Sequence, residues 1–366
     1  MTILLFFTVL FVLILVHEWG HFIVAKKTGM RVEEFGIGFP PKLFSRVWHG
    51  TEYSFNALPI GGFVRIFGEN AQDAAEEAEA GGDVSGSFTS KSKLAQAAVL
   101  IAGVTMNILF AWLLFTVVFV MGVPSAVTEE EATDNATLVV TSVLDGAPAA
   151  DANIPLGAEI VSLRSGETQL DTLTPSAFAD FAGAATDPIE LTYLEGEVTE
   201  TVTLSPAAGF IPDEPERQAI GVALALIETV KQPIHLALYD GFLTTVSSLV
   251  AITVGIASLL VQSIQGTADF SQVAGPVGIV GLVGDAAAFG LTSLLMFTAI
   301  ISLNLAVINM LPFPALDGGR LLFVAIEAVT RRPINPVWVA RLNVAGFVLL
   351  MLLMVAVTWN DIARLL

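Results

Sequence analysis

Two histidines and a glutamate interrupt an apolar segment near the start of the chain. In LILVHEWGHFIVAKK, residues 13–27, His17, Glu18 and His21 form the pattern H-E-x-x-H. Side chains four residues apart share one helix face, so both histidines can reach one metal ion, with Glu18 placed to hold a water on it. The alternative is a pair of core histidines without a metal. Because the chain has only four histidines, and polar groups in an apolar span are costly, we predict a zinc site.

A catalytic zinc site has three protein ligands and one open position, so a third ligand is required. The segment NMLPFPALDGGRLLF, residues 309–323, offers Asp317 directly before two glycines. Pro312 and Pro314 lack the backbone donors of a regular helix and are predicted to break the helix that precedes them. By itself, Asp317 is equally consistent with a zinc ligand and with a helix N-cap. Beside the histidine motif, we predict that it is a ligand.

Membrane helices are needed to position these residues. Hydrophobic residues make up 54% of the chain and charged residues only 14%, which is too apolar for a soluble protein of this length. No basic region precedes the first apolar run, so we expect a retained anchor rather than a signal peptide. The absence of cysteine excludes disulfides and thiolate metal sites. Four spans of roughly 20 residues or more are predicted, at 2–24, 95–122, 291–316 and 342–359.

The net charge of −19 is unevenly distributed, which predicts the sidedness. Residues 125–218 contain 18 acidic and two basic residues, whereas 25–95 contain eight Lys and Arg and 320–341 four more. Basic loops stay in the cytoplasm, while a folded domain crosses regardless of its acidity. We therefore expect 25–94 and 320–341 inside, and 123–235 and both chain ends outside.

The segment 234–264 is apolar enough to span, but a crossing there would place Arg331 and Arg332 outside, against the charge bias. We predict helices that lie on or dip into the outer surface instead. The first and third spans then both run inward. At 1.5 Å per residue His17 lies about 24 Å along the first span, so His17 and Asp317 reach a similar depth.

Two further regions interrupt the spans. Residues 31–67 mix short apolar runs with Gly and Pro, which predicts β-hairpins, and the acidic stretch 69–90 predicts a flexible insert. Acids in this loop offset the bases, so no nucleic-acid surface is expected. Residues 125–215 predict a small α/β domain. Its order of elements, and the stretch from Ala147 to Ile160, resemble a PDZ domain, although Asn153 stands where Gly is usual and Ala158 also departs.

Taken together, the motifs resemble the site-2 protease family, and the bacterial branch typified by the regulator of sigma-E protease is most similar. H-E-x-x-H lies in the first span, N-x-x-P-x-P-x-L-D-G-G in a later one, and the PDZ-like domain between them. VEEFGIGFPPKLF and NALPIGGFVRIFGE resemble the family's membrane-reentrant β region. IAGVTMNILFA resembles its second span, with Val104 in place of the usual proline, and AGPVGIV (274–280) resembles the stretch before its LDG helix.

This resemblance implies a polytopic α-helical membrane protein of about four transmembrane helices, with a membrane-reentrant β region and an inserted extracytoplasmic PDZ-like α/β domain. The first membrane half would be 1–124, the inserted domain 125–215 and the second membrane half 216–366. The implied location is the inner (plasma) membrane, with the active site toward the cytoplasm. The implied activity is zinc-dependent cleavage of single-span membrane proteins within the bilayer, for example anti-sigma factors or signal-peptide remnants, after a first cut by another protease of the site-1 type.

Carried over by position, His17, His21 and Asp317 bind zinc, Glu18 is the general base and Asn309 contacts substrate. We also expect an edge strand near Phe55 to Ile66 to hold the unwound substrate by β-augmentation. The predicted substrate-binding residues are Asn309, Pro312, Pro314, Gly61, Gly62 and Phe63.

Three other classes of protein remain open at this point. A zinc-free scaffold that recruits partners through its PDZ domain should have lost Glu18 or Asp317, and both are present. A transporter also carries polar residues in its spans, but the chain shows no internal repeat. A different membrane metallopeptidase with H-E-x-x-H would normally take a glutamate as its third ligand.

Overall fold

The protein consists of two compact units. The computed structural model describes residues 2–69, 77, 79, 83–196, 198–210, 216–267 and 274–365. Met1–Val120 and Pro233–Leu366 form one unit, here called the membrane unit, and Met121–Gln232 form the other, called the sheet unit. The predicted flexible insert, 69–90, falls partly outside the described residues, so its flexibility stays a prediction.

The membrane unit is built mainly from long apolar helices. Two shorter helices, α7 (Pro276–Ala288) and α9 (Asp317–Thr330), lie beside them. Among the described residues, five helices are long and apolar enough to cross a membrane: α1 (Thr2–Lys27), α3 (Lys93–Met121), α6 (Ile234–Gln265), α8 (Leu291–Met310) and α10 (Pro336–Leu365).

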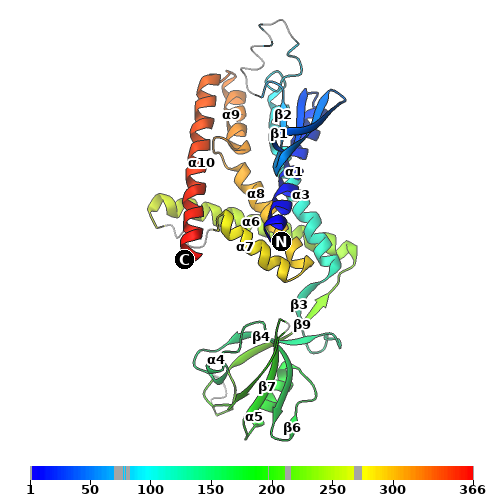
Figure 1. Cartoon of the computed structure of the whole chain (residues 1–366), viewed down its shortest axis with the longest axis vertical. Coiled ribbons are helices and arrows are strands. Elements are labelled where there is room, and N and C mark those ends of the chain that lie inside the picture. The colour runs from blue at the N-terminus through cyan, green and yellow to red at the C-terminus, as the bar shows by residue number, and fades with distance from the viewer. Residues whose placement is uncertain are drawn as a thin grey trace. The chain divides into compact units, whose positions relative to one another are not determined.

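Helix α6 covers the segment that was expected to lie on the outer surface. It is one continuous helix of 32 residues, where the sequence predicted more than one. Its length and composition suffice for a crossing, yet it lies across the direction of α1, α8 and α10 (Figure 1). The number of spans therefore stays a prediction.

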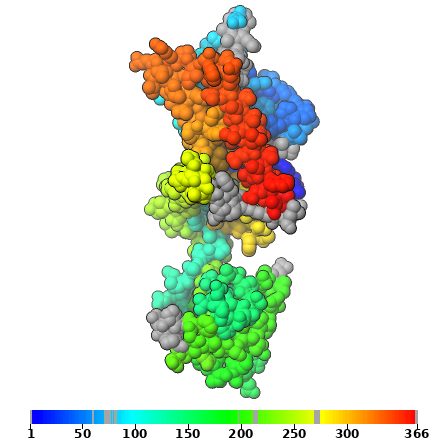
Figure 2. All heavy atoms as spheres, turned by 90° about the vertical axis from the view of Figure 1, so that its left-hand side faces the viewer, coloured from blue at the N-terminus to red at the C-terminus, as the bar shows by residue number. Residues whose placement is uncertain are grey.

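Much of the apolar surface of the membrane unit is uncovered by protein. Only 6% of the most apolar window of α6, and 6% of that of α10, is buried. Figure 2 shows α10, in red, running along the surface of the unit. Exposed apolar area of this extent would drive association in water, whereas an acyl-chain environment covers it without cost.

A small antiparallel sheet packs beside α1. The strands β1 (Val32–Trp48) and β2 (Thr51–Ile66) pair with each other twice, because both are bent. The result is four short segments in the order 62–66, 32–37, 51–56 and 42–48. The predicted β-hairpins over 31–67 are thus confirmed, and the segment 62–66 forms one edge of the sheet.

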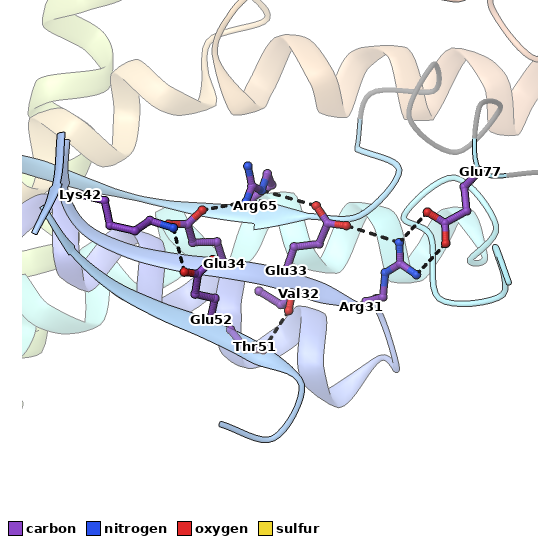
Figure 3. Close-up of polar contacts among 9 residues, drawn as sticks. All are labelled: Arg31, Val32, Glu33, Glu34, Lys42, Thr51, Glu52, Arg65 and Glu77. Carbon is purple, nitrogen blue, oxygen red and sulfur yellow. Dashed lines mark hydrogen bonds and ion pairs between the residues drawn. The ribbon is translucent and has the colours of Figure 1, made fainter. Parts of the chain in front are cut away.

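A chain of ion pairs crosses one face of this sheet (Figure 3). Lys42 lies 2.8 Å from Glu52 and 3.1 Å from Glu34, while Arg65 lies 2.7 Å from Glu34 and 3.4 Å from Glu33. Exposed pairs of this kind contribute only about 0–1 kcal/mol each. Glu34, however, is only 4% exposed, so losing its cations would leave a buried charge. The chain of pairs connects all four segments and therefore opposes any slip in register.

The opposite face of the sheet is aromatic and contacts α1. Neighbouring residues on a regular strand point to opposite faces, so Phe35 faces away from Glu34. Glu33 departs from this alternation because the register shifts between Val32 and Glu34. The rings of Phe35 and Tyr53 lie 5.2 and 6.0 Å from the ring of Phe22 on α1. These contacts hold the sheet against the helix that carries the H-E-x-x-H motif.

The sheet unit is one antiparallel sheet with two helices, α4 (Pro148–Asp151) and α5 (Pro175–Ala184). Its strand order is β3-β9-β4-β5-β7-β8, and β6 pairs with β5. The strands are β3 (Val123–Val127), β4 (Thr137–Val143), β5 (Glu159–Ser165), β6 (Thr168–Gln169), β7 (Ile189–Glu195), β8 (Val198–Leu204) and β9 (Val222–Val230).

The unit contains both strands and helices, as predicted for a small α/β domain, but it is wider than the predicted 125–215. The last strand, β9, lies beyond that range and pairs with both β4 and β3. It returns to the sheet after a long connection, which leaves no local pattern in the sequence. Asn153 adopts a φ of 54°, the conformation for which glycine is preferred and which asparagine tolerates best among other residues.

Candidate metal centre

The histidines of the H-E-x-x-H motif lie together on one buried face of α1. His17 and His21 are 6% and 8% exposed, and their Nε2 atoms are 3.1 Å apart. Helix α3 crosses closely at this point: a Cβ added at Gly103 would lie 2.4 Å from His21 Nε2. Glycine is therefore needed here for space rather than for an unusual backbone angle. The tight crossing leaves the two rings little freedom to turn.

Asp317 joins the histidines from the far end of the sequence. Helix α8 ends at Met310, as expected before Pro312 and Pro314, and Asp317 is the first residue of α9. The N-cap of α9 is Leu316, and no side chain caps it, so Asp317 does not serve as the cap. Its Oδ2 instead lies 3.0 Å from His17 Nε2 and 3.3 Å from His21 Nε2.

These three atoms form a triangle whose size suits zinc. Its sides are 3.0, 3.1 and 3.3 Å, and ligand atoms about 2.0–2.1 Å from a tetrahedral zinc lie roughly 3.3 Å apart. The Nδ1 of His21 is 2.8 Å from the Val99 carbonyl oxygen, which only accepts, so Nδ1 donates and Nε2 keeps a lone pair. Groups that converge this closely are held together by a shared proton or by a cation between them. The donor set of two imidazoles and one carboxylate fits Zn²⁺.

A cavity of about 190 Å³ opens beside this triangle. Glu18 lines it together with all three ligands. The edge segment 62–66 of the small sheet forms another wall, since a Cβ built at Gly62 would lie 4.0 Å from Glu18 Cγ. The cavity is lined by His17, Glu18, His21, Phe63, Val64, Ile66, Glu69, Val99, Leu100, Asp317 and Arg320.

The residues predicted to bind substrate divide into two groups. Phe63 lines the cavity and Gly62 lies beside Glu18, as the edge-strand hypothesis requires, whereas the neighbouring Gly61 does not line the cavity. Asn309, Pro312 and Pro314 do not line it: Asn309 lies near the end of α8, and the two prolines lie in the connection to α9. The roles in substrate binding stay predictions for both groups.

Three residues near the ligands were missed from the sequence. Asn107 on α3 lies 3.2 Å from His17 Nδ1, measured from its Nδ2. Arg320 donates a hydrogen bond to the carboxylate of Glu69. Both side chains line the cavity beside the zinc ligands and also a second cavity of about 470 Å³. Arg320 follows Asp317 by three residues, a spacing that places both on one helix face. Asn107 follows Gly103 by four residues, which was the available signal for its position.

Comparison with known proteins decides the family. The model of peptidase family M50 matches residues 5–353. The chain belongs to this family, the site-2 proteases. A putative zinc metalloprotease of Clostridium perfringens is 35% identical over 351 residues, which cover 96% of this chain and 95% of that protein.

Two further relatives carry more specific names. The zinc metalloprotease RasP of Oceanobacillus iheyensis is 31% identical over 421 residues, covering 100% of this chain and 99% of the relative. The regulator of sigma-W protease RasP of Bacillus subtilis is 28% identical over 437 residues, with the same coverage. The chain is therefore a zinc metalloprotease and, with its apolar helices, a multi-pass membrane protein of the family that performs intramembrane proteolysis.

Proposed function

We propose that this metalloprotease cleaves single-span membrane proteins inside the bilayer of the inner membrane, after another protease has removed their outer part. Anti-sigma factors and signal-peptide remnants are the substrate classes we favour, the first because one relative is named as a regulator of sigma-W protease. The observation that carries the proposal is the position of the ligands. His17 and His21 lie within an apolar helix of 26 residues that is long enough to span.

Bound zinc supplies Lewis acidity and lowers the pKa of water, which makes hydrolysis feasible at neutral pH. Glu18 lines the same cavity as the ligands and acts as the general base and then the general acid. Its carboxylate takes a proton from the attacking water and later gives that proton to the leaving amine. His17, His21 and Asp317 hold the ion, and the buried surroundings exclude bulk water.

A helical substrate hides its carbonyl groups in hydrogen bonds and must be extended before attack. The edge segment 62–66 pairs on one side with 32–37 and has no strand on its other side among the described residues. Because this segment lines the catalytic cavity beside Glu18, a substrate added to it as a further strand would pass the metal. Binding of this kind depends on backbone groups and so tolerates many substrate sequences.

The contact between His17 and Asp317 also supports the proposed topology. If α1 runs inward, His17 lies in the inner half of the membrane, and α8 must run inward as well to bring Asp317 to that depth. α8 then starts outside, on the same side as the acidic sheet unit. α8 can start outside if α6 lies along the outer surface and does not cross the membrane. The orientation of α6 across α1, α8 and α10 supports this topology (Figure 1).

Incubation with a panel of truncated single-span proteins tests the proposal. We expect cleavage inside the apolar span, loss of cleavage with a zinc chelator, and recovery when zinc is returned. Cuts confined to soluble loops would contradict the proposed site of action.

The sidedness of the chain is tested by single cysteines placed at Ser176 and Ser92, whose labelling by a membrane-impermeant thiol reagent should differ. The cysteine at 176 should be labelled from outside in intact cells, and the cysteine at 92 only after permeabilisation.

A further inference from the structure

Asn107 is a fully buried amide in a membrane helix, and it contacts a zinc ligand. Its side chain lies in α3, is 0% exposed, and places Nδ2 3.2 Å from His17 Nδ1. Its Oδ1 is buried and has no hydrogen-bond partner among the described residues. A buried amide atom without a hydrogen-bond partner destabilises the folded protein, because its interaction with water is lost and not replaced. Such a residue needs an explanation beyond the packing of α3 against α1.

The chemistry of His17 gives that explanation. Its Nε2 is the atom that faces Asp317 and His21, so Nε2 must keep its lone pair for the metal. A neutral imidazole carries one proton, which must then be on Nδ1. An N–H at Nδ1 needs an acceptor, and the side chain of Asn107 is the group within reach of it.

The amide of Asn107 can supply this acceptor. A half-turn about its Cβ–Cγ bond exchanges Oδ1 and Nδ2 without changing the shape of the side chain. Oδ1 then accepts the proton of His17 Nδ1, and the atom without a partner becomes Nδ2. His21 is held in the same way, because its Nδ1 donates to the Val99 carbonyl at 2.8 Å. Both ligands then present Nε2 lone pairs to one ion.

The backbone near Asn107 is itself held in place. The hydroxyl of Ser302 on α8 donates a hydrogen bond to the backbone carbonyl oxygen of Asn107 at 2.9 Å, and Ser302 is 0% exposed. One turn earlier on α3, Gly103 allows close contact with both histidine rings. The backbone of Asn107 is therefore held by α8, while its side chain contacts His17 on α1. Groups that orient metal ligands are commonly fixed in this way.

We propose that Asn107 is a positioning residue for the zinc centre. Its side-chain carbonyl accepts the Nδ1 proton of His17, selects the tautomer with a free Nε2 and fixes the plane of the ring. It does not touch the substrate or the metal. The alternative is an amide that only fills space between α1 and α3.

Three variants separate these roles: Asn107→Leu, Asn107→Asp and the control Asn304→Leu. Leucine keeps the volume without an acceptor, whereas aspartate keeps an acceptor. The amide of Asn304 bonds only to the Ile300 carbonyl of its own helix among the contacts described. Zinc affinity of the purified protein in detergent is measured by competition with a chelator, without substrate, so the outcome is independent of the substrate class proposed above.

We expect Asn107→Leu to weaken zinc binding by ~10–100-fold. Asn107→Asp should restore it close to the parent value, and Asn304→Leu should leave it unchanged. Parent-like affinity in Asn107→Leu would overturn the proposal. An Asn107→Asp protein that is folded but binds zinc as weakly as Asn107→Leu would also overturn it, because a hydrogen-bond acceptor at this position would then make no difference.

A measurement on the parent protein covers the case in which the variants fail to fold. The chain has only four histidines, so ¹⁵N-histidine labelling gives few signals. In the zinc-loaded protein we expect the proton of His17 on Nδ1, shown by long-range ¹⁵N–¹H correlation. A His17 without a proton on Nδ1 would refute the hydrogen bond to Asn107.

Discussion

The two units of this protein have opposite interiors. Among the described residues, every buried polar or charged side chain belongs to the membrane unit, including His17, Glu34, Asn107 and Ser302. The core of the sheet unit is apolar, and Tyr193 is the one buried side chain with a polar atom in the part of this unit that the structure describes. The surfaces of the two units show the opposite contrast. The sheet unit carries most of the acidic charge, while α6 and α10 of the membrane unit expose apolar side chains.

This contrast shows where the chemistry belongs. A water-soluble unit gains stability by burying apolar groups, so a polar core would only weaken it. In a lipid environment the apolar groups need no burial, and the interior is free for polar groups that bind a metal or a substrate. If the zinc centre depends on the membrane unit alone, changes near the ligands should affect it and changes in the sheet unit should not.

Removing a zinc ligand should have the largest effect. Asp317→Ala deletes one of three ligands, so bound zinc should fall well below one ion per chain and proteolysis should stop. Metal analysis together with the cleavage assay measures both. Stoichiometric zinc in an Asp317→Ala protein that still cleaves would show that the third ligand has been assigned wrongly.

Glu18→Gln should reduce proteolysis without reducing the amount of bound zinc. The amide has the same size but does not accept the proton of the attacking water, so turnover should fall by about 10²–10⁴-fold while zinc stays bound. The matched control is Glu130→Gln, on the exposed surface of the sheet unit, which should leave turnover unchanged. Near-normal turnover in Glu18→Gln would refute its role as the base.

Gly103→Ala should have an intermediate effect on zinc. The added methyl group would overlap His21 Nε2 and His17 Cε1, and overpacking of this kind costs about 1–3 kcal/mol. We expect zinc affinity to fall about tenfold. Gly255→Ala on α6 is the control, since a Cβ there meets nothing within 4 Å. Equal affinities in the two variants would mean that α3 does not constrain the histidines.

A cavity in the sheet unit should leave the metal centre unaffected. Leu163→Ala removes a side chain that is 0% exposed and should destabilise this unit by about 2–5 kcal/mol. Hydrogen exchange of the amides of β5 and β7 would report the loss, while zinc content stays at the parent value. Loss of zinc in this variant would show that the two units are coupled, contrary to the contrast drawn above.

Much of the centre could be predicted from local patterns. The spacing of His17 and His21 fixes their common helix face, and Pro312 with Pro314 predicts the break before Asp317. The Gly and Pro content of 31–67 predicts the β-hairpins. The edge strand was expected near Phe55 to Ile66, but the pairing places only 62–66 at the edge, since Phe55 pairs with both Ile37 and Phe44. Asn107 and Arg320 were missed because their local signals, a spacing of four residues from Gly103 and of three from Asp317, do not reveal which side chains lie opposite them.

The metal chemistry, the membrane setting and the family can be predicted from the sequence alone, because ligand spacing and apolar run length are properties of neighbouring residues. The folded structure is needed to show that Asp317 faces the histidines rather than capping α9, and that Asn107 contacts His17. The tertiary structure also places β9 beside β4, where Thr137 pairs with Ile227, 90 positions further along the chain. Contacts across 90 to 300 positions arise from the packing of whole helices and strands, and no local periodicity encodes that packing.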